Sequence, residues 1–102
     1  MKIQEFASLH EDIRRKIGFP RFEYIKKERL LSPCEDLNGI LLLKKLSPGH
    51  EEKVIACSEH DELTLSFDPK EVAENATEED IHDMLCSGIF YDESDGCFRI
   101  LT

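Results

Sequence analysis

Two closely spaced pairs of cysteine and histidine are the residues best suited to bind a metal ion. Cys57 and His60 are three residues apart, and His82 and Cys86 are four apart, which puts the second pair on one face of a helix. Thiolate and neutral imidazole are ligands of tetrahedral zinc. However, there is no Cys-x-x-Cys pair, and the two pairs would have to converge from different elements. We therefore predict no metal and no cofactor, with Cys57 and Cys86 buried and both histidines at the surface; zinc binding is the alternative.

Catalytic residues are harder to assign, because no segment has a recognisable catalytic context. The chain has four histidines, four cysteines and 22 carboxylates, from which many triads could be drawn. None of them lies in a nucleophile elbow, a phosphate-binding loop or a dinucleotide fingerprint. We predict that the protein is not an enzyme.

Charge is distributed unevenly along the chain. Residues 1–57 hold 11 basic and 9 acidic residues, whereas residues 58–102 hold 2 basic and 13 acidic residues, which gives the net charge of −9. In the acidic half we expect Glu79 and Asp83, four residues apart on one helix, to share an exposed face with Asp80 beside them. We predict a partner-binding surface of Glu59, Asp61, Glu62, Glu71, Glu74, Glu78, Glu79, Asp80 and Asp83.

Basic residues gather between positions 14 and 29, interleaved with Phe19, Phe22 and Tyr24. Such a segment can follow a phosphate backbone and stack on bases. The alternative nucleic-acid-binding residues are Arg14, Arg15, Lys16, Arg21, Lys26, Lys27 and Arg29. A net charge of −9 opposes direct nucleic-acid binding. We therefore favour pairing of this segment with the acidic half, within one molecule or head to tail between copies.

Size and acidity together favour a binding protein. We predict a small protein that binds and inhibits or regulates a basic macromolecular partner through residues 59–83, as inhibitors and immunity proteins of similar composition do. The alternative is a mimic of the nucleic-acid backbone, which would occupy the site of a DNA- or RNA-binding protein.

Length and composition indicate a single domain, residues 1–102, with one modest core. Hydrophobic residues make up 40% of the chain, and the longest aliphatic run, residues 40–43, is far too short to cross a bilayer. The first residues do not resemble a signal peptide. We expect a cytoplasmic protein whose four cysteines are thiols.

The first third of the chain is expected to contain one clear helix. Apolar residues recur every three or four positions over residues 2–17, and Gly18 and Pro20 then end the pattern. Residues 21–31 alternate as in a strand that leads into a turn at Ser32-Pro33. The alternative is a second helix that begins at this turn, which has an N-cap serine, a proline at the first position and a glutamate three residues after the serine.

The pattern of the remaining sequence, from residue 40 onward, predicts an α+β domain. The apolar runs 40–46, 53–58 and 62–67 are separated by turn compositions and predict a three-stranded antiparallel meander. A short helix at 70–75 and a capped helix from Thr77 follow, and residues 89–101 form a hairpin around Asp95-Gly96. The last three elements have the order of a winged helix-turn-helix. The second helix has four carboxylates and no basic residue, which disfavours DNA binding.

Overall fold

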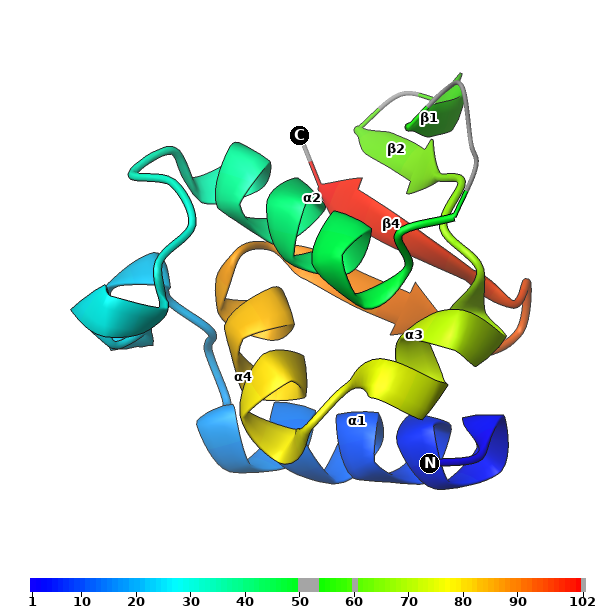
Figure 1. The fold of residues 1–102 in the computed structure, drawn as a ribbon, viewed down its shortest axis with the longest axis horizontal. Coiled ribbons are helices and arrows are strands. Elements are labelled where there is room, and N and C mark those ends of the chain that lie inside the picture. Colours follow the sequence, from blue (N-terminus) through cyan, green and yellow to red (C-terminus); the bar gives the residue numbers. More distant parts are fainter. Residues whose placement is uncertain (50–53, 60, 102) are drawn as a thin grey trace.

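The computed structural model describes residues 1–49, 54–59 and 61–101 and confirms the α+β class (Figure 1). The elements are α1 (Ile3–Ile17), the 3-10 turns η1 (Phe22–Tyr24) and η2 (Lys27–Arg29), α2 (Glu35–Leu46), β1 (Ile55–Glu59), β2 (Glu62–Leu65), α3 (Pro69–Asn75), α4 (Glu78–Cys86), β3 (Ile89–Asp92) and β4 (Cys97–Leu101).

One antiparallel sheet contains the four described strands in the order β1-β2-β4-β3. The last two strands predicted for the meander, observed as β1 and β2, and the predicted C-terminal hairpin of β3 and β4 belong to this one sheet, because β2 pairs with β4 in a register that places Leu65 opposite Phe98. Alternation along the strands turns Leu65, Phe98 and Ile100 toward the core and Thr64 and Arg99 to the outer face.

The predicted N-terminal helix is confirmed as α1. Its stripe of Phe6, Ala7, His10 and Ile13 is buried, and the chain leaves the helix at Gly18 with a φ of 72°, a conformation that glycine adopts without strain.

Residues 40–46 form the second half of a helix, so the predicted first strand of the meander is wrong. The alternative start near Ser32-Pro33 is nearly right, because α2 begins at Glu35 with Cys34 as its N-cap. The Asp36 carboxylate accepts hydrogen bonds from the Cys34 thiol and the Leu37 amide, and these bonds lower the pKa of Asp36. A short apolar run does not by itself distinguish a buried strand from a helix.

The predicted strand over residues 21–31 is also wrong. This segment forms η1 and η2, and η1 packs against α4. Asn38, buried in α2, fixes the end of the segment, because its side-chain oxygen accepts from the amides of Leu31 and Ser32 at 2.7 and 3.1 Å. Its amide nitrogen donates to Ser87 Oγ and ties this loop to the end of α4.

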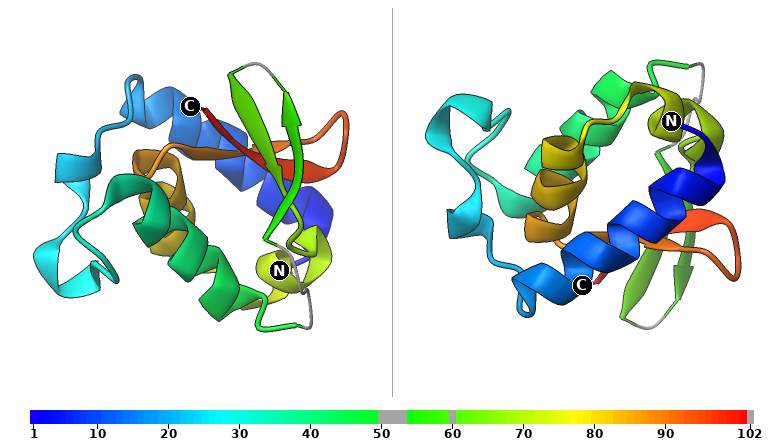
Figure 2. Two further views of the ribbon diagram at one scale, coloured as in Figure 1. Left: turned by 90° about the horizontal axis from the view of Figure 1, so that it is seen from above. Right: turned by 90° about the horizontal axis from the view of Figure 1, so that it is seen from below.

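The predicted helix pair is confirmed, and its caps explain its boundaries. The Asp68 side chain accepts from Lys70 N at the start of α3, and Thr77 and Asp80 form a reciprocal capping box at the start of α4. In Figure 2, α1 and α2 flank this pair on opposite sides. Since α4 also contacts η1 and β3, it is enclosed rather than presented to a DNA groove.

Close packing joins α2 to the end of α4. Gly39 lies on the buried face of α2, where an added Cβ would be 2.6 Å from Ile89 Cδ1 and 2.9 Å from Ser87 Cβ. The absence of a side chain at Gly39 therefore allows α2 to approach the end of α4 closely.

None of the helices in the described ranges is long and apolar enough to cross a membrane.

A buried histidine of α1 contacts the outer edge of β3. His10 Nε2 accepts a hydrogen bond from the Tyr91 amide at 3.1 Å, so the imidazole is neutral. Burial, with a further contribution from Arg14, lowers the pKa of His10 to about 4. Phe6 and Tyr91 pack edge to face beside it.

Candidate interaction site

Arg29 joins the basic segment to the acidic half within one molecule. From η2, its Nε donates to Asp83 Oδ2 at 2.6 Å and lies 3.5 Å from Glu79 Oε2, while Nη2 donates to Asp80 Oδ1 at 2.8 Å. The hydrogen bond with Asp83 is the largest of the interactions that raise the pKa of Arg29. These contacts span 51 and 54 residues, so no local pattern could have revealed them.

The expectation that Glu79, Asp80 and Asp83 form an exposed acidic face is therefore wrong. The Asp83 side chain is only 6% exposed, Asp80 is 14% exposed and also caps α4, and only Glu79, at 61%, faces solvent. The guanidinium of Arg29 compensates the buried carboxylate of Asp83 and the half-buried one of Asp80, which explains how helix α4 tolerates them.

A second arginine, Arg99, forms an ion pair with Glu62, another residue of the predicted partner-binding surface. On the outer face of the sheet, Arg99 pairs with Glu62 at 3.4 Å, with Asp92 at 3.1 Å and with Asp95. Glu62 is thus part of a local ion-pair cluster on β2, β3 and β4. Its carboxylate is already partly compensated before any partner arrives.

The remaining predicted residues occupy different parts of the surface. Glu74 lies on the exposed face of α3, near its end, and Glu78 is the first residue of α4. Both side chains are exposed, and in the described part of the chain neither makes an ion pair. Glu71 is half-buried, Asp61 is exposed in the β1–β2 turn, and Glu59 ends β1. We call Glu74, Glu78 and Glu79 the junction surface, because they surround the link between α3 and α4.

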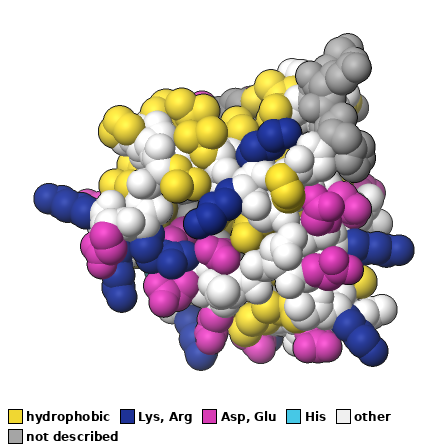
Figure 3. Space-filling model, in the orientation of Figure 1, with side chains coloured by type: hydrophobic (Ala, Val, Ile, Leu, Met, Phe, Trp, Pro, Cys, Tyr) yellow, Lys and Arg dark blue, Asp and Glu magenta, His cyan; other side chains and the backbone are white. Residues whose placement is uncertain are grey.

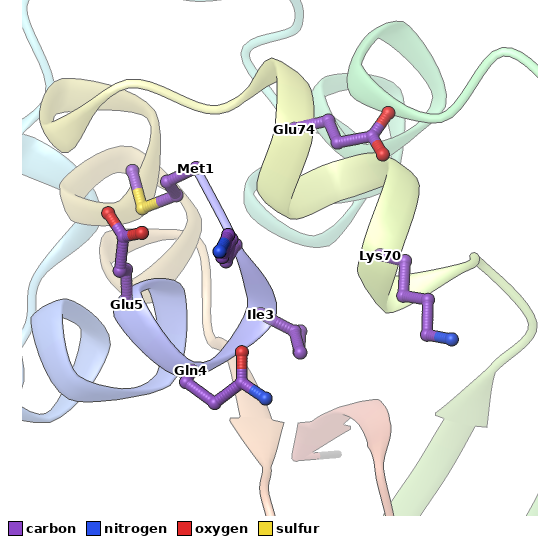
Figure 4. A pocket seen from close by; sticks show the side chains of 7 residues that line it. Met1, Ile3, Gln4, Glu5, Lys70 and Glu74 are labelled. Atoms are coloured by element: carbon purple, nitrogen blue, oxygen red, sulfur yellow. The ribbon is translucent and has the colours of Figure 1, made fainter.

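A hollow beside the junction surface has mixed charge. The start of α1 and the exposed side of α3 line it, and Figure 4 shows Lys70 and Glu74 on one wall and Glu5 on the other. The lining residues are Met1, Lys2, Ile3, Gln4, Glu5, Lys70 and Glu74. The charges of the two lysine and two glutamate side chains around the hollow balance one another.

Most of the basic segment remains exposed. Arg14, Arg15, Lys16, Arg21, Lys26 and Lys27 face solvent, and Arg29 is the member held by the acidic half. Arg15 and Arg21 make exposed pairs with Glu11 and Glu23. Phe19 is 77% exposed, with the Arg21 guanidinium 6.0 Å from its ring centre, and Tyr24 is also exposed.

The structure does not gather the residues of the zinc alternative. Cys57 lies exposed on the edge strand β1, contrary to the expectation that it is buried, whereas Cys86 is buried in α4 as expected. In Figures 1 and 2 these elements are well separated. His60 lies outside the described residues, among which no three potential ligands cluster.

Three residues of α4, Cys86, His82 and Asp83, lie close together in the order of a Cys-His-Asp catalytic triad. The sequence did not predict this arrangement. His82 Nε2 lies 3.7 Å from Cys86 Sγ, and His82 Nδ1 lies 2.9 Å from Asp83 Oδ1. The i, i+4 spacing of His82 and Cys86 was the available signal. Burial raises the pKa of the Cys86 thiol, and the side chain is 2% exposed, so the thiol is neither activated nor accessible to a substrate.

Comparison with known proteins assigns no class: no family model, curated protein or solved structure matches the chain.

Proposed function

We propose that this protein is a non-enzymatic binding protein that engages a basic macromolecular partner through its junction surface, and so inhibits or regulates that partner. The observation that supports the proposal is the exposure of Glu74 and Glu78, neither of which forms an ion pair with a described residue. Glu79 extends this surface and retains most of its exposure beside Arg29.

The electrostatics favour fast, salt-sensitive association. A chain with a net charge of −9 attracts a basic surface over a distance of about a Debye length, roughly 8 to 10 Å at physiological salt. Carboxylates at the rim of an interface mainly increase the association rate and the specificity. The proposed mechanism is therefore occlusion of a basic site by steering followed by steric contact.

Charge reversal of the junction surface tests the proposal. Each Glu→Lys change adds two charges, so the triple variant Glu74→Lys/Glu78→Lys/Glu79→Lys alters the net charge from −9 to −3. The matched control, Asp12→Lys/Glu28→Lys/Glu93→Lys, makes the same change at exposed positions elsewhere. Wild type and both variants are used as bait in nuclease-treated native lysate at low and high salt.

The expected result is a partner that is lost at high salt and with the junction variant but retained by the control. Retention by the junction variant would contradict the proposal, and equal loss with both variants would reduce it to an effect of overall charge. Displacement of the captured partner by DNA or RNA would identify the protein as a nucleic-acid mimic, the narrower form of the same proposal.

The exposed aromatic side chains favour a second candidate function, nucleic-acid binding by the basic segment. Phe19 and Tyr24 are both available for stacking beside Arg21, Lys26 and Lys27. A labelled single-stranded oligonucleotide at low salt should then gain fluorescence anisotropy, and Phe19→Ala should weaken binding, since one base–aromatic stack contributes about 1–3 kcal/mol. No binding at low salt would exclude this candidate.

A further inference from the structure

Helix α2 is apolar on two opposite faces, but the fold covers only one of them. Leu42, Leu43 and Leu46 face the core, whereas Leu37 and Leu41 are 45% and 37% exposed. A helix that is apolar all round is normally buried all round. Figure 3 shows hydrophobic side chains gathered over α2 and the loop before it, where Leu31 is also exposed.

The outward face also has a defined arrangement of charge. Leu37 lies three and four residues before Ile40 and Leu41, and Lys44 lies four and three residues after them, so the four residues form one stripe in which Ile40 is partly buried against the core. Asp36 precedes the stripe in the first turn of the helix, and Lys44 ends it in the last turn. Both charged residues are exposed, and each lies four positions from Ile40.

This arrangement is self-complementary in only one of the two symmetric ways to pair the helix with itself. In an antiparallel pair with a two-fold axis level with Ile40, Asp36 is level with Lys44 of the second copy and Ile40 with its counterpart, while Leu37 is offset from Leu41 of the second copy by about 3 Å along the axis. The contact occurs twice, because the pair is symmetric. A parallel pair would instead bring Asp36 against Asp36 and Lys44 against Lys44.

We propose that the outward face of α2 binds a second copy of this chain in an antiparallel, two-fold symmetric dimer. The interface has an apolar centre of Leu37, Ile40 and Leu41, with an Asp36–Lys44 ion pair at each end. A helix of 12 residues is about 18 Å long, so the dimer belongs to the small, concentration-dependent class of interfaces. The junction surface belongs to α3 and α4, so this inference is independent of the proposed function.

Sedimentation equilibrium of the full chain tests the dimer. Over protein concentrations from about 1 μM to about 1 mM, the weight-average mass should rise from 11.8 kDa toward twice that value. Lys44→Glu should raise the dissociation constant about tenfold, because two attractive contacts become repulsive. Lys45→Glu, the same charge change on the flank of α2, is the matched control and should have a smaller effect.

Mixing two variants provides the decisive readout. Asp36→Lys and Lys44→Glu should each dimerise poorly alone, but an equimolar mixture should regain the wild-type mass, because the mixed dimer has two attractive contacts, one with the original polarity and one with reversed polarity. Leu41→Ser tests the apolar centre without a change of charge, and far-UV circular dichroism confirms that each variant is folded. A wild type that remains at 11.8 kDa up to about 1 mM, or a dimer that Lys44→Glu and Leu41→Ser leave unchanged, would overturn the proposal.

Discussion

The pairing of Arg29 with Asp83 predicts a large loss of stability when the arginine is replaced. Arg29→Met retains much of the side chain's apolar length but removes the charge, which leaves a carboxylate that is 6% exposed without its 2.6 Å donor. Removal of one partner from a buried pair costs about 3–5 kcal/mol. Since Arg29 is itself 29% exposed and Asp83 retains its contact with His82, we expect the free energy of unfolding to fall by about 2–4 kcal/mol.

Urea unfolding followed by far-UV circular dichroism measures this loss, since the chain has no tryptophan. Arg21→Met is the control: its pair with Glu23 is exposed on both sides and should contribute no more than about 0.5 kcal/mol. Asp83→Asn removes the buried charge, so it should make Arg29→Met less costly, with a coupling energy of about 1–3 kcal/mol in a double-mutant cycle.

Two results would refute the reasoning. A loss for Arg29→Met no larger than that for Arg21→Met would mean that Asp83 does not depend on Arg29. Additive effects of Arg29→Met and Asp83→Asn would mean that the two side chains are not energetically coupled. In either case the explanation for the missing acidic face on α4 would fail.

Three further predictions concern the core and a helix cap. The lowered pKa of His10 means that this side chain binds a proton below pH 6.5 in the unfolded chain but only below about pH 4 in the folded chain. The free energy of unfolding should therefore decrease by about 3 kcal/mol as the pH falls through this window. In urea titrations, His10→Gln should remove most of that pH dependence. Gly39→Ala should destabilise by about 1–3 kcal/mol despite its better helix propensity, because the new Cβ would meet Ser87 at 2.9 Å; a higher melting temperature would contradict this. Thr77→Ala should cost about 1 kcal/mol through loss of the capping box, and an unchanged melting temperature would show that this cap contributes nothing.

Elements with a complete local signal could be predicted from the sequence. The apolar period and Gly18 define α1, the capping residues Asp68 and Thr77 define the starts of α3 and α4, and Asp95-Gly96 marks the turn between β3 and β4. In each case the determinants lie within a few residues of the boundary that they set.

The sequence favours a strand over the helix α2, because the contacts that stabilise this helix are tertiary. Asn38 and Gly39 resemble a turn, and the following leucines resemble a strand. In the fold, Asn38 bonds to Ser87 Oγ, and Gly39 allows close contact with Ile89. These contacts favour a helix, but they join positions 49 and 50 residues apart.

The candidate site shows the same limit. Asp83 has the spacing of a solvent-facing helix residue, and only Arg29, placed beside it by two 3-10 turns, explains its burial. Glu74 and Glu78 could be predicted as exposed because the caps on either side of them set the orientation of α3 and α4. Whether a carboxylate is compensated depends on distant arginines, which charge patterning alone does not place.

The hydrogen bond from the Tyr91 amide to His10 also protects the sheet against the addition of a strand from another molecule. An edge strand with unused amides is a template for a strand of another molecule. The imidazole occupies the outward-facing Tyr91 amide of β3, and at the other edge the pairing of β1 is irregular between Ile55 and Cys57. Neither edge presents a long regular ladder, so the four strands are expected to resist aggregation by strand addition, and acidification that protonates His10 would weaken the protection at β3.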